Sequence, residues 1–170
     1  MVANLSSHKR GWDDRWEEFS AAAEEGQQLK DALLRAVDED TDAFNAIMTA
    51  FGLPKGTPEE KTHRKAAIEA ATRKATEVPA QVMRLAAGMF PLVRQMVEQG
   101  NPNSVTDAGV GALCARAAVH GAYLNVKINA SGLENRAFAE QVLEEGAALV
   151  ALADREEREI IALVQAKIAG

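Results

Sequence analysis

The chain has 170 residues with 19 basic and 25 acidic side chains, which gives a formal charge of −6. An apolar share of 47% and a charged share of 26% are ordinary for a globular protein and exclude disorder for the bulk of the chain. The acidic balance argues against a nucleic-acid partner, and no apolar run in the sequence approaches the length of a membrane span. Cys114 is the single cysteine, so no internal disulfide and no zinc-type Cys/His cluster is expected, and the expected location is cytoplasmic.

Helical periodicity fills the chain between three breaks. Glycine and proline concentrate at residues 51–56 and 100–104, and a softer break falls at 131–132. Pro79 is expected to mark a bend or restart, and Pro91 a kink. The apolar spacing between the breaks predicts helices at residues 12–51, 58–76, 79–99, 104–130 and 133–168.

The start of the second helix has the clearest signal. Thr57 is expected as the N-cap, Pro58 as the first helical residue and Glu60 as the partner that closes a capping box. No strand of convincing length occurs in the sequence. These features predict an all-α fold, an antiparallel helical bundle with long helices, in a single domain spanning residues 1–170.

Asp40 lies in the middle of an apolar helical stripe. The stripe alternates spacings of four and three residues and comprises Leu33, Val37, Asp40, Phe44, Ile47 and Phe51. Burying a carboxylate there is unfavourable unless it is paired or hydrogen-bonded, and a buried carboxyl group suits proton transfer near neutral pH. Two interpretations stay open on spacing alone: a functional acid, or a core aspartate paired with an arginine such as Arg94 or Arg116.

The helix predicted at 104–130 is rich in glycine and alanine. Each glycine inside a helix costs roughly 1 kcal/mol against alanine, so close approach of another helix or of a ligand is expected. Asn125 and Asn129 are four residues apart and share a face, either as ligand contacts or as inter-helix hydrogen-bonding residues. Asp107 lies on the same face, but at 1.5 Å per residue it is about 27 Å from Asn125. Only a second helix or a second subunit would unite these two residues in one site.

Two further polar segments are weaker candidates. Residues 101–107 place polar groups ahead of a helix N-terminus, where free N–H groups favour an anion or a carbonyl, but from the residues alone plain capping by Ser104 or Thr106 is the favoured explanation. The basic cluster at residues 8–10 suits a ligand carboxylate or is simply a solvated end.

Four blocks of the sequence resemble the cyclodeaminase/methenyltetrahydrofolate cyclohydrolase family, which occurs as the C-terminal domain of formimidoyltransferase-cyclodeaminase and as standalone bacterial enzymes. The blocks are residues 37–44, 52–61, 100–110 and 121–129, and the resemblance covers essentially the whole chain. It implies an all-helical homodimer that acts on a one-carbon unit bound to tetrahydrofolate. A tetrahydrofolate derivative is then the substrate, and neither a metal nor a tightly bound cofactor is implied.

The resemblance also implies residue roles. In the family, the second acid of the D-x-D block is the catalytic carboxylate, and here that position is Asp40, which the apolar stripe singles out independently. The substrate contacts that the resemblance implies are Asn101, Asp107, Asn125, Asn129 and Lys9. The sequence departs from the family at its start, because it lacks the N-terminal Pro-Gly-Gly-Gly-Ser turn and part of the first helix.

Two reactions fit the resemblance. A formiminotetrahydrofolate cyclodeaminase converts 5-formiminotetrahydrofolate to 5,10-methenyltetrahydrofolate plus ammonia, with Asp40 as general acid/base. A methenyltetrahydrofolate cyclohydrolase adds water to the methenyl carbon in the same cleft. Tyr123 resembles the cyclodeaminases and residues 132–140 resemble the standalone cyclohydrolases. The cyclodeaminase is slightly favoured, the cyclohydrolase is the alternative, and a truncated, non-catalytic helical oligomer is a second alternative.

Overall fold

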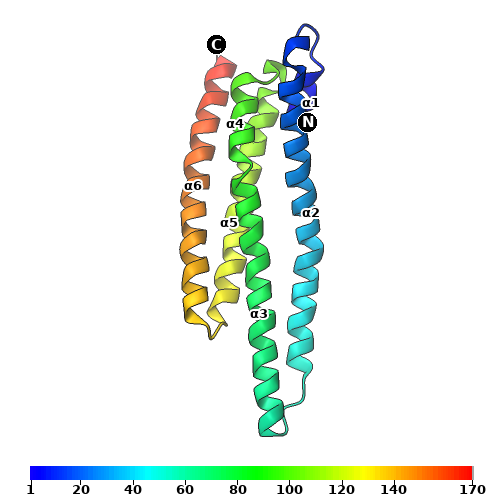
Figure 1. Ribbon diagram of the computed structural model, residues 1–170. Helices are drawn as coiled ribbons and strands as arrows, with labels where there is room; N and C mark the ends of the chain where they lie inside the picture. The colour runs from blue at the N-terminus through cyan, green and yellow to red at the C-terminus, as the bar shows by residue number, and fades with distance from the viewer. Residues whose placement is uncertain (170) are drawn as a thin grey trace.

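A computed structural model describes residues 1–169 as an all-α bundle, which confirms the predicted fold class (Figure 1). No strand occurs within these residues, and none of their helices is long and apolar enough to cross a membrane. The elements are α1 (Val2–Ser7), η1 (Asp13–Arg15), α2 (Trp16–Gly52), α3 (Pro58–Ala87), α4 (Phe90–Gln99), η2 (Pro102–Ser104), α5 (Val105–Ser131) and α6 (Arg136–Ala169), where η marks a 3-10 turn.

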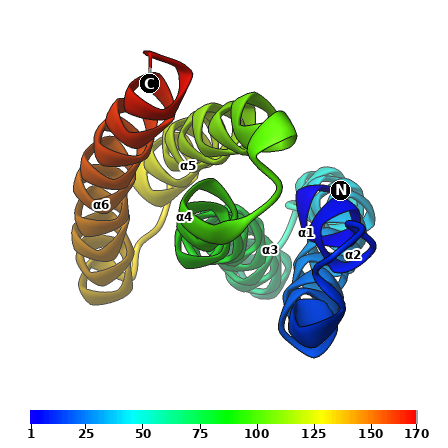
Figure 2. The same ribbon diagram turned by 90° about the horizontal axis from the view of Figure 1, so that it is seen from above.

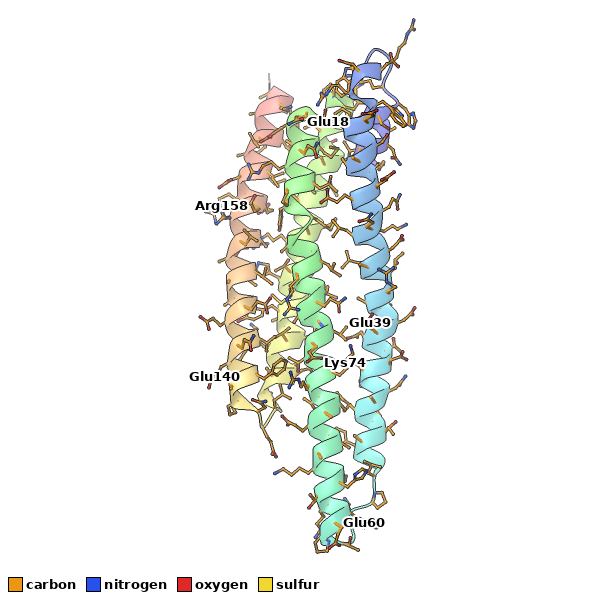
Figure 3. The ribbon with its side chains drawn as sticks, in the orientation of Figure 1. Glu18, Glu39, Glu60, Lys74, Glu140 and Arg158 are labelled. Atoms are coloured by element: carbon orange, nitrogen blue, oxygen red, sulfur yellow. The ribbon has the colours of Figure 1, made fainter. Side chains whose placement is uncertain are left out.

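The four long helices stand side by side with alternating direction (Figure 1). α2 packs on α3, α3 and α4 pack on α5, and α5 packs on α6. Seen from above, α3 and α4 lie between α2 on one side and α5 and α6 on the other (Figure 2). The α2–α3 hairpin extends past the lower ends of α5 and α6, and Glu60 lies near its tip (Figure 3).

The start of α3 follows the prediction, but its end does not. Glu60 N donates to Thr57 Oγ1 at 3.2 Å and Thr57 N donates to Glu60 Oε2 at 3.0 Å, which is the capping box expected there. The predicted break after residue 76 is wrong, because α3 runs without interruption to Ala87. The kink predicted at Pro91 occurs as an interruption of the helix at residues 88–89, just before Phe90, so that Pro91 lies in the first turn of α4, where a missing N–H is tolerated.

Pro79 is accommodated inside α3 by a side chain from α5. Proline has no N–H, so the carbonyl of Ala75, four residues earlier, has no partner within the helix. Asn129 Nδ2 donates to that carbonyl at 2.7 Å. Ala75 is buried, so water does not reach its carbonyl. The Asn129 amide therefore takes the place of the N–H group that proline lacks.

The apolar stripe around Asp40 is not the buried edge of α2. Val37 and Phe44 are 63% and 60% exposed, and Asp40 is exposed as well. The residues of α2 that pack on α3 are smaller and seven apart, namely Ala36, Ala43 and Ala50. Alanine at this spacing lets two helices approach closely, which turns the larger side chains of α2 toward an open flank of the bundle.

Glu69 of α3 forms hydrogen bonds with the turn between α5 and α6. Its carboxylate accepts the backbone N–H groups of Glu134 and Asn135 at 2.9 and 3.0 Å. These two hydrogen bonds hold the pKa of the Glu69 carboxyl below its ordinary value. Asn135 in turn accepts the N–H of Phe138 at 3.1 Å and so caps the start of α6.

Removal of the Asn129 amide should destabilise the bundle. Asn129→Ala leaves the Ala75 carbonyl unpaired, so we expect the free energy of unfolding to fall by roughly 1–3 kcal/mol. Asn125→Ala is the matched control, since that exposed amide donates to Gly121 O within α5, and its effect should stay within about 0.5 kcal/mol. Urea unfolding followed by circular dichroism measures both variants. Equal free energies of unfolding for Asn129→Ala and Asn125→Ala would show that Asn129 does not support the helix at Pro79.

Acid should weaken the Glu69 contact. Because its pKa is lowered in the folded chain, the stabilisation is complete above the ordinary glutamate pKa and is lost as the pH falls through the folded-state value. Glu69→Gln should therefore lower the melting temperature at pH 7, and its curve should approach that of the wild type toward pH 3. Glu140→Gln, at an exposed position on α6, should follow the wild type throughout. A constant offset between Glu69→Gln and wild type at every pH would contradict this account.

Candidate functional site

A cavity of about 420 Å³ lies between α2, α3 and α5, within the size range of small-molecule sites. It unites Asp40 of α2 and Asn125 of α5, two residues that were predicted separately. Glu39, which precedes Asp40 in the sequence, is labelled in Figure 3 and shows where along α2 the cavity lies. The remainder of the lining is mostly apolar and comprises Leu33, Ala36, Val37, Thr41, Val78, Pro79, Val82, Ala118 and Ala122.

The two arginines considered as partners of Asp40 form ion pairs with α6 instead. Arg94 donates to two glutamates of α6, and Arg116 donates to Asp154 of α6 at 2.6 Å. The hydrogen bonds from His120 and Arg116 hold the pKa of the Asp154 carboxyl below its ordinary value. Neither arginine lines the cavity. The interpretation of Asp40 as a structural ion-pair residue with either of them is therefore wrong, and its carboxylate stands against an apolar wall.

Asn125 and Asn129 share a face of α5 but have different surroundings. Asn125 lines the cavity, and the hydrogen bond from its Nδ2 to Gly121 O at 3.1 Å leaves its Oδ1 as an acceptor. Asn129 lies one turn further along and its amide is used by the Ala75 carbonyl. Of the two amides, Asn125 is the one placed to meet a ligand in the cavity.

Asp107 lines a second cavity, of about 320 Å³, between α1, α2, α4 and α5. Because α5 is continuous from Val105 to Ser131, the predicted separation of about 27 Å from Asn125 holds. The two cavities follow one another along α2 and α5. Asp107 is thus far along the bundle from Asp40, and no second helix brings these two carboxylates together.

Asn101 and Lys9 lie away from the Asp40 cavity, at the end of the bundle that holds the chain start. Asn101 Oδ1 accepts the N–H of Asn103 at 3.1 Å, and its own N–H donates to Ser6 Oγ at 2.8 Å. Lys9 Nζ lies 4.0 Å from the ring centroid of Trp12, a cation–π contact. Each of these contacts orders the local chain, and neither residue lines a cavity with Asp40.

Two lining residues were missed by the sequence analysis. Thr41, next to Asp40, adds a hydroxyl to the same cavity, although its Oγ1 donates to Val37 O at 3.1 Å. Lys30 lines the neighbouring cavity, one turn before Leu33. Extending the stripe of α2 one turn toward the N-terminus would have reached Lys30, because the same alternation of three and four residues includes it. Within residues 1–169, no three metal-binding side chains converge.

Comparisons with known proteins agree on one family. The family model described as formiminotransferase-cyclodeaminase matches residues 1–148. A methenyltetrahydrofolate cyclohydrolase of Methylorubrum extorquens is 38% identical over 168 residues, which cover 99% of this chain and 81% of that protein. The formimidoyltransferase-cyclodeaminase of Gallus gallus is 36% identical over 111 residues, which cover 65% of this chain and 20% of that much longer protein.

A solved structure shares the fold. The crystal structure of formiminotetrahydrofolate cyclodeaminase from Thermotoga maritima matches with a TM-score of 0.83, over 99% of this chain and 80% of that chain. Its sequence identity is 23%, so this match shows the helical architecture alone. The family model and the relative that spans nearly the whole chain carry the assignment further: the chain belongs to the formiminotransferase-cyclodeaminase family.

Proposed function

We propose that the chain is a folate one-carbon enzyme that hydrolyses 5,10-methenyltetrahydrofolate to 10-formyltetrahydrofolate, with Asp40 as the general acid/base. The observation that carries this proposal is the apolar cavity in which Asp40 and Asn125 meet. Apolar walls suit the aromatic parts of a reduced folate, and a few polar groups suffice to orient such a ligand. The similarity to a methenyltetrahydrofolate cyclohydrolase, over 99% of this chain and 81% of that protein, supports the same reaction.

The exposed position of Asp40 suits a reaction that consumes water. Its carboxylate accepts a proton from water as the oxygen bonds to the methenyl carbon between N5 and N10. The bond from that carbon to N5 then breaks, N5 takes the proton from Asp40, and the hydroxyl proton leaves to solvent as the formyl carbonyl forms. The negative charge of Asp40 also favours the positively charged methenyl substrate. Asn125 Oδ1 remains available to accept a hydrogen bond from a substrate N–H.

The cyclodeaminase reaction, which the sequence alone slightly favoured, is the second candidate. Tyr123 is the residue that resembles the cyclodeaminases, but its Oη donates to Leu143 O of α6 at 3.1 Å, and its ring fills the space beside Gly146. Tyr123 therefore packs between α5 and α6 and does not line the Asp40 cavity. Similarity to a formimidoyltransferase-cyclodeaminase supports this second reaction. The chemistry is compatible as well, because attack of N10 on a formimino carbon passes through a tetrahedral carbon between the same two nitrogens.

Asp40→Asn should abolish turnover and leave the fold intact. The amide keeps the shape of the side chain but does not accept a proton, so we expect kcat to fall by about 100-fold or more. Asp42→Asn is the matched control, because Asp42 is exposed on the same helix and does not line the cavity. Steady-state loss of methenyl absorbance measures both variants. Wild-type turnover by Asp40→Asn would remove Asp40 from the mechanism.

A paired assay separates the two reactions. The purified chain is given 5,10-methenyltetrahydrofolate in one cuvette and 5-formiminotetrahydrofolate in the other. We expect accelerated loss of methenyl absorbance in the first, above the uncatalysed rate. Appearance of methenyl product with ammonia release in the second would establish the cyclodeaminase instead. Silence in both, with no folate binding, would favour the non-catalytic oligomer.

A further inference from the structure

Among the described residues that line the Asp40 cavity and the second cavity, which Asp107 lines, Lys30 is the only one with a basic side chain. It lies on α2 ten residues before Asp40, in the same alternation of three and four residues. Because α2 is continuous from Trp16 to Gly52, the Cα atoms of Lys30 and Asp40 are about 15 Å apart along the helix axis. The proposed reaction makes no use of this lysine.

The wall that α5 contributes to the two cavities consists of small residues. Ala108 and Gly111 line the second cavity, and Ala118 and Ala122 line the Asp40 cavity. Ala115 lies between these two pairs, in the same alternation of three and four residues. Along this face α5 therefore places no large side chain between the two cavities, and it does not block an extended ligand that reaches from one into the other.

The shape of the proposed substrate matches the spacing of Asp40 and Lys30. Beyond N10, tetrahydrofolate continues as a benzoyl group that an amide bond joins to glutamate, which carries two carboxylates. By ordinary bond lengths these carboxylates lie roughly 9–12 Å from N10, and a lysine ammonium lies about 6 Å from its own Cα. With the reacting carbon at Asp40, the glutamate of the substrate therefore reaches the level of Lys30.

The charges of the lining residues favour a carboxylate beside Lys30. The other charged side chains among the described lining residues are the carboxylates of Asp40 and Asp107, which repel an anion. Lys30 Nζ lies 3.0 Å from Asp31 Oδ1, but both side chains are more than half exposed, so this ion pair contributes little and does not hold the lysine away from a ligand. Lys30 is thus the lining group that attracts the negatively charged end of the substrate.

We infer that Lys30 binds the glutamate carboxylates of the folate substrate and so selects folates over pteroates, the analogues that lack glutamate. This inference rests on the proposed function, because it takes a reduced folate as the ligand. Lys30 acts on substrate binding and not on the chemical step, since it lies about 15 Å from Asp40 along α2. The second cavity is then the site of the substrate tail.

Removal of the glutamate from the substrate tests the contact. The two substrates are 5,10-methenyltetrahydrofolate and 5,10-methenyltetrahydropteroate, and loss of methenyl absorbance gives KM and kcat for each. For the wild type we expect KM to be about 10-fold lower for the folate, the size expected of one hydrogen bond between charged groups. Lys30→Ala should raise KM for the folate to that for the pteroate, without change in kcat or in KM for the pteroate.

Three further variants serve as controls. Arg35→Ala removes the same charge from an exposed position on α2 that lines neither cavity, so KM for the folate should not change. Lys30→Arg should keep most of the preference for the folate, because a guanidinium also binds carboxylates. Lys74→Ala tests the opposite orientation of the ligand, since Lys74 of α3 lies beyond Glu39 toward the hairpin tip (Figure 3), and it should keep the full preference.

Calorimetric titration separates failure of this contact from failure of the proposed function. Wild type and Lys30→Ala are titrated with tetrahydrofolate and with tetrahydropteroate, so that no turnover is needed. Equal affinity of the wild type for the two ligands, or an unchanged preference in Lys30→Ala, would overturn the inference and leave the proposed function in place. Loss of the preference in Arg35→Ala or Lys74→Ala would overturn it as well. A wild type that binds neither ligand would overturn both the inference and the proposed function.

Discussion

The hydrogen bond from Asn129 to the Ala75 carbonyl joins α5 to α3 at the point where Pro79 interrupts the hydrogen bonding of the helix. Pro79 leaves that carbonyl without a partner, and the amide from α5 occupies it at 2.7 Å. The same stretch of α3 contributes Pro79 to the cavity wall, and α5 contributes Asn125, one turn before Asn129. The contact that satisfies the carbonyl opposite Pro79 therefore lies next to two walls of the cavity. A proline in the middle of a long helix leaves one carbonyl without a helical partner, and here another helix supplies it.

This tertiary contact explains where sequence reasoning about the helices succeeded and where it failed. The capping box at Thr57 is local, so the residues predict it and the structure confirms it. Proline is also a local signal, but its effect depends on what lies alongside. The break expected near Pro79 is absent, and Asn129, fifty residues later, donates to the buried Ala75 carbonyl that Pro79 leaves without a partner. No residue near Pro79 in the sequence indicates that Asn129 will be the hydrogen-bond donor.

The site was predictable to a similar extent. Spacing identified Asp40 as an acid on an apolar face, and the family resemblance identified Asn125, but neither established that they share a cavity. The apolar face itself was misplaced, since the small residues Ala36 and Ala43 form the buried edge and the larger ones remain open. Hydrophobic periodicity gives the direction of an apolar face without telling which neighbour covers it. The resemblance also implied substrate contacts by Asn101 and Lys9, but neither residue lines the cavity that contains Asp40.

The α2–α3 hairpin has few buried apolar residues of its own. Below the main core, these helices meet through a small separate cluster of Ala43, Ala75 and Val78, with Ile47 against it. The hairpin also projects past α5 and α6 (Figure 1). Few apolar contacts give a segment a low free energy of local opening, well below that of global unfolding. Val78 of this cluster lines the cavity together with Asp40, so the wall that α2 contributes is supported by a few small contacts and not by the main core around Phe90 and Val119.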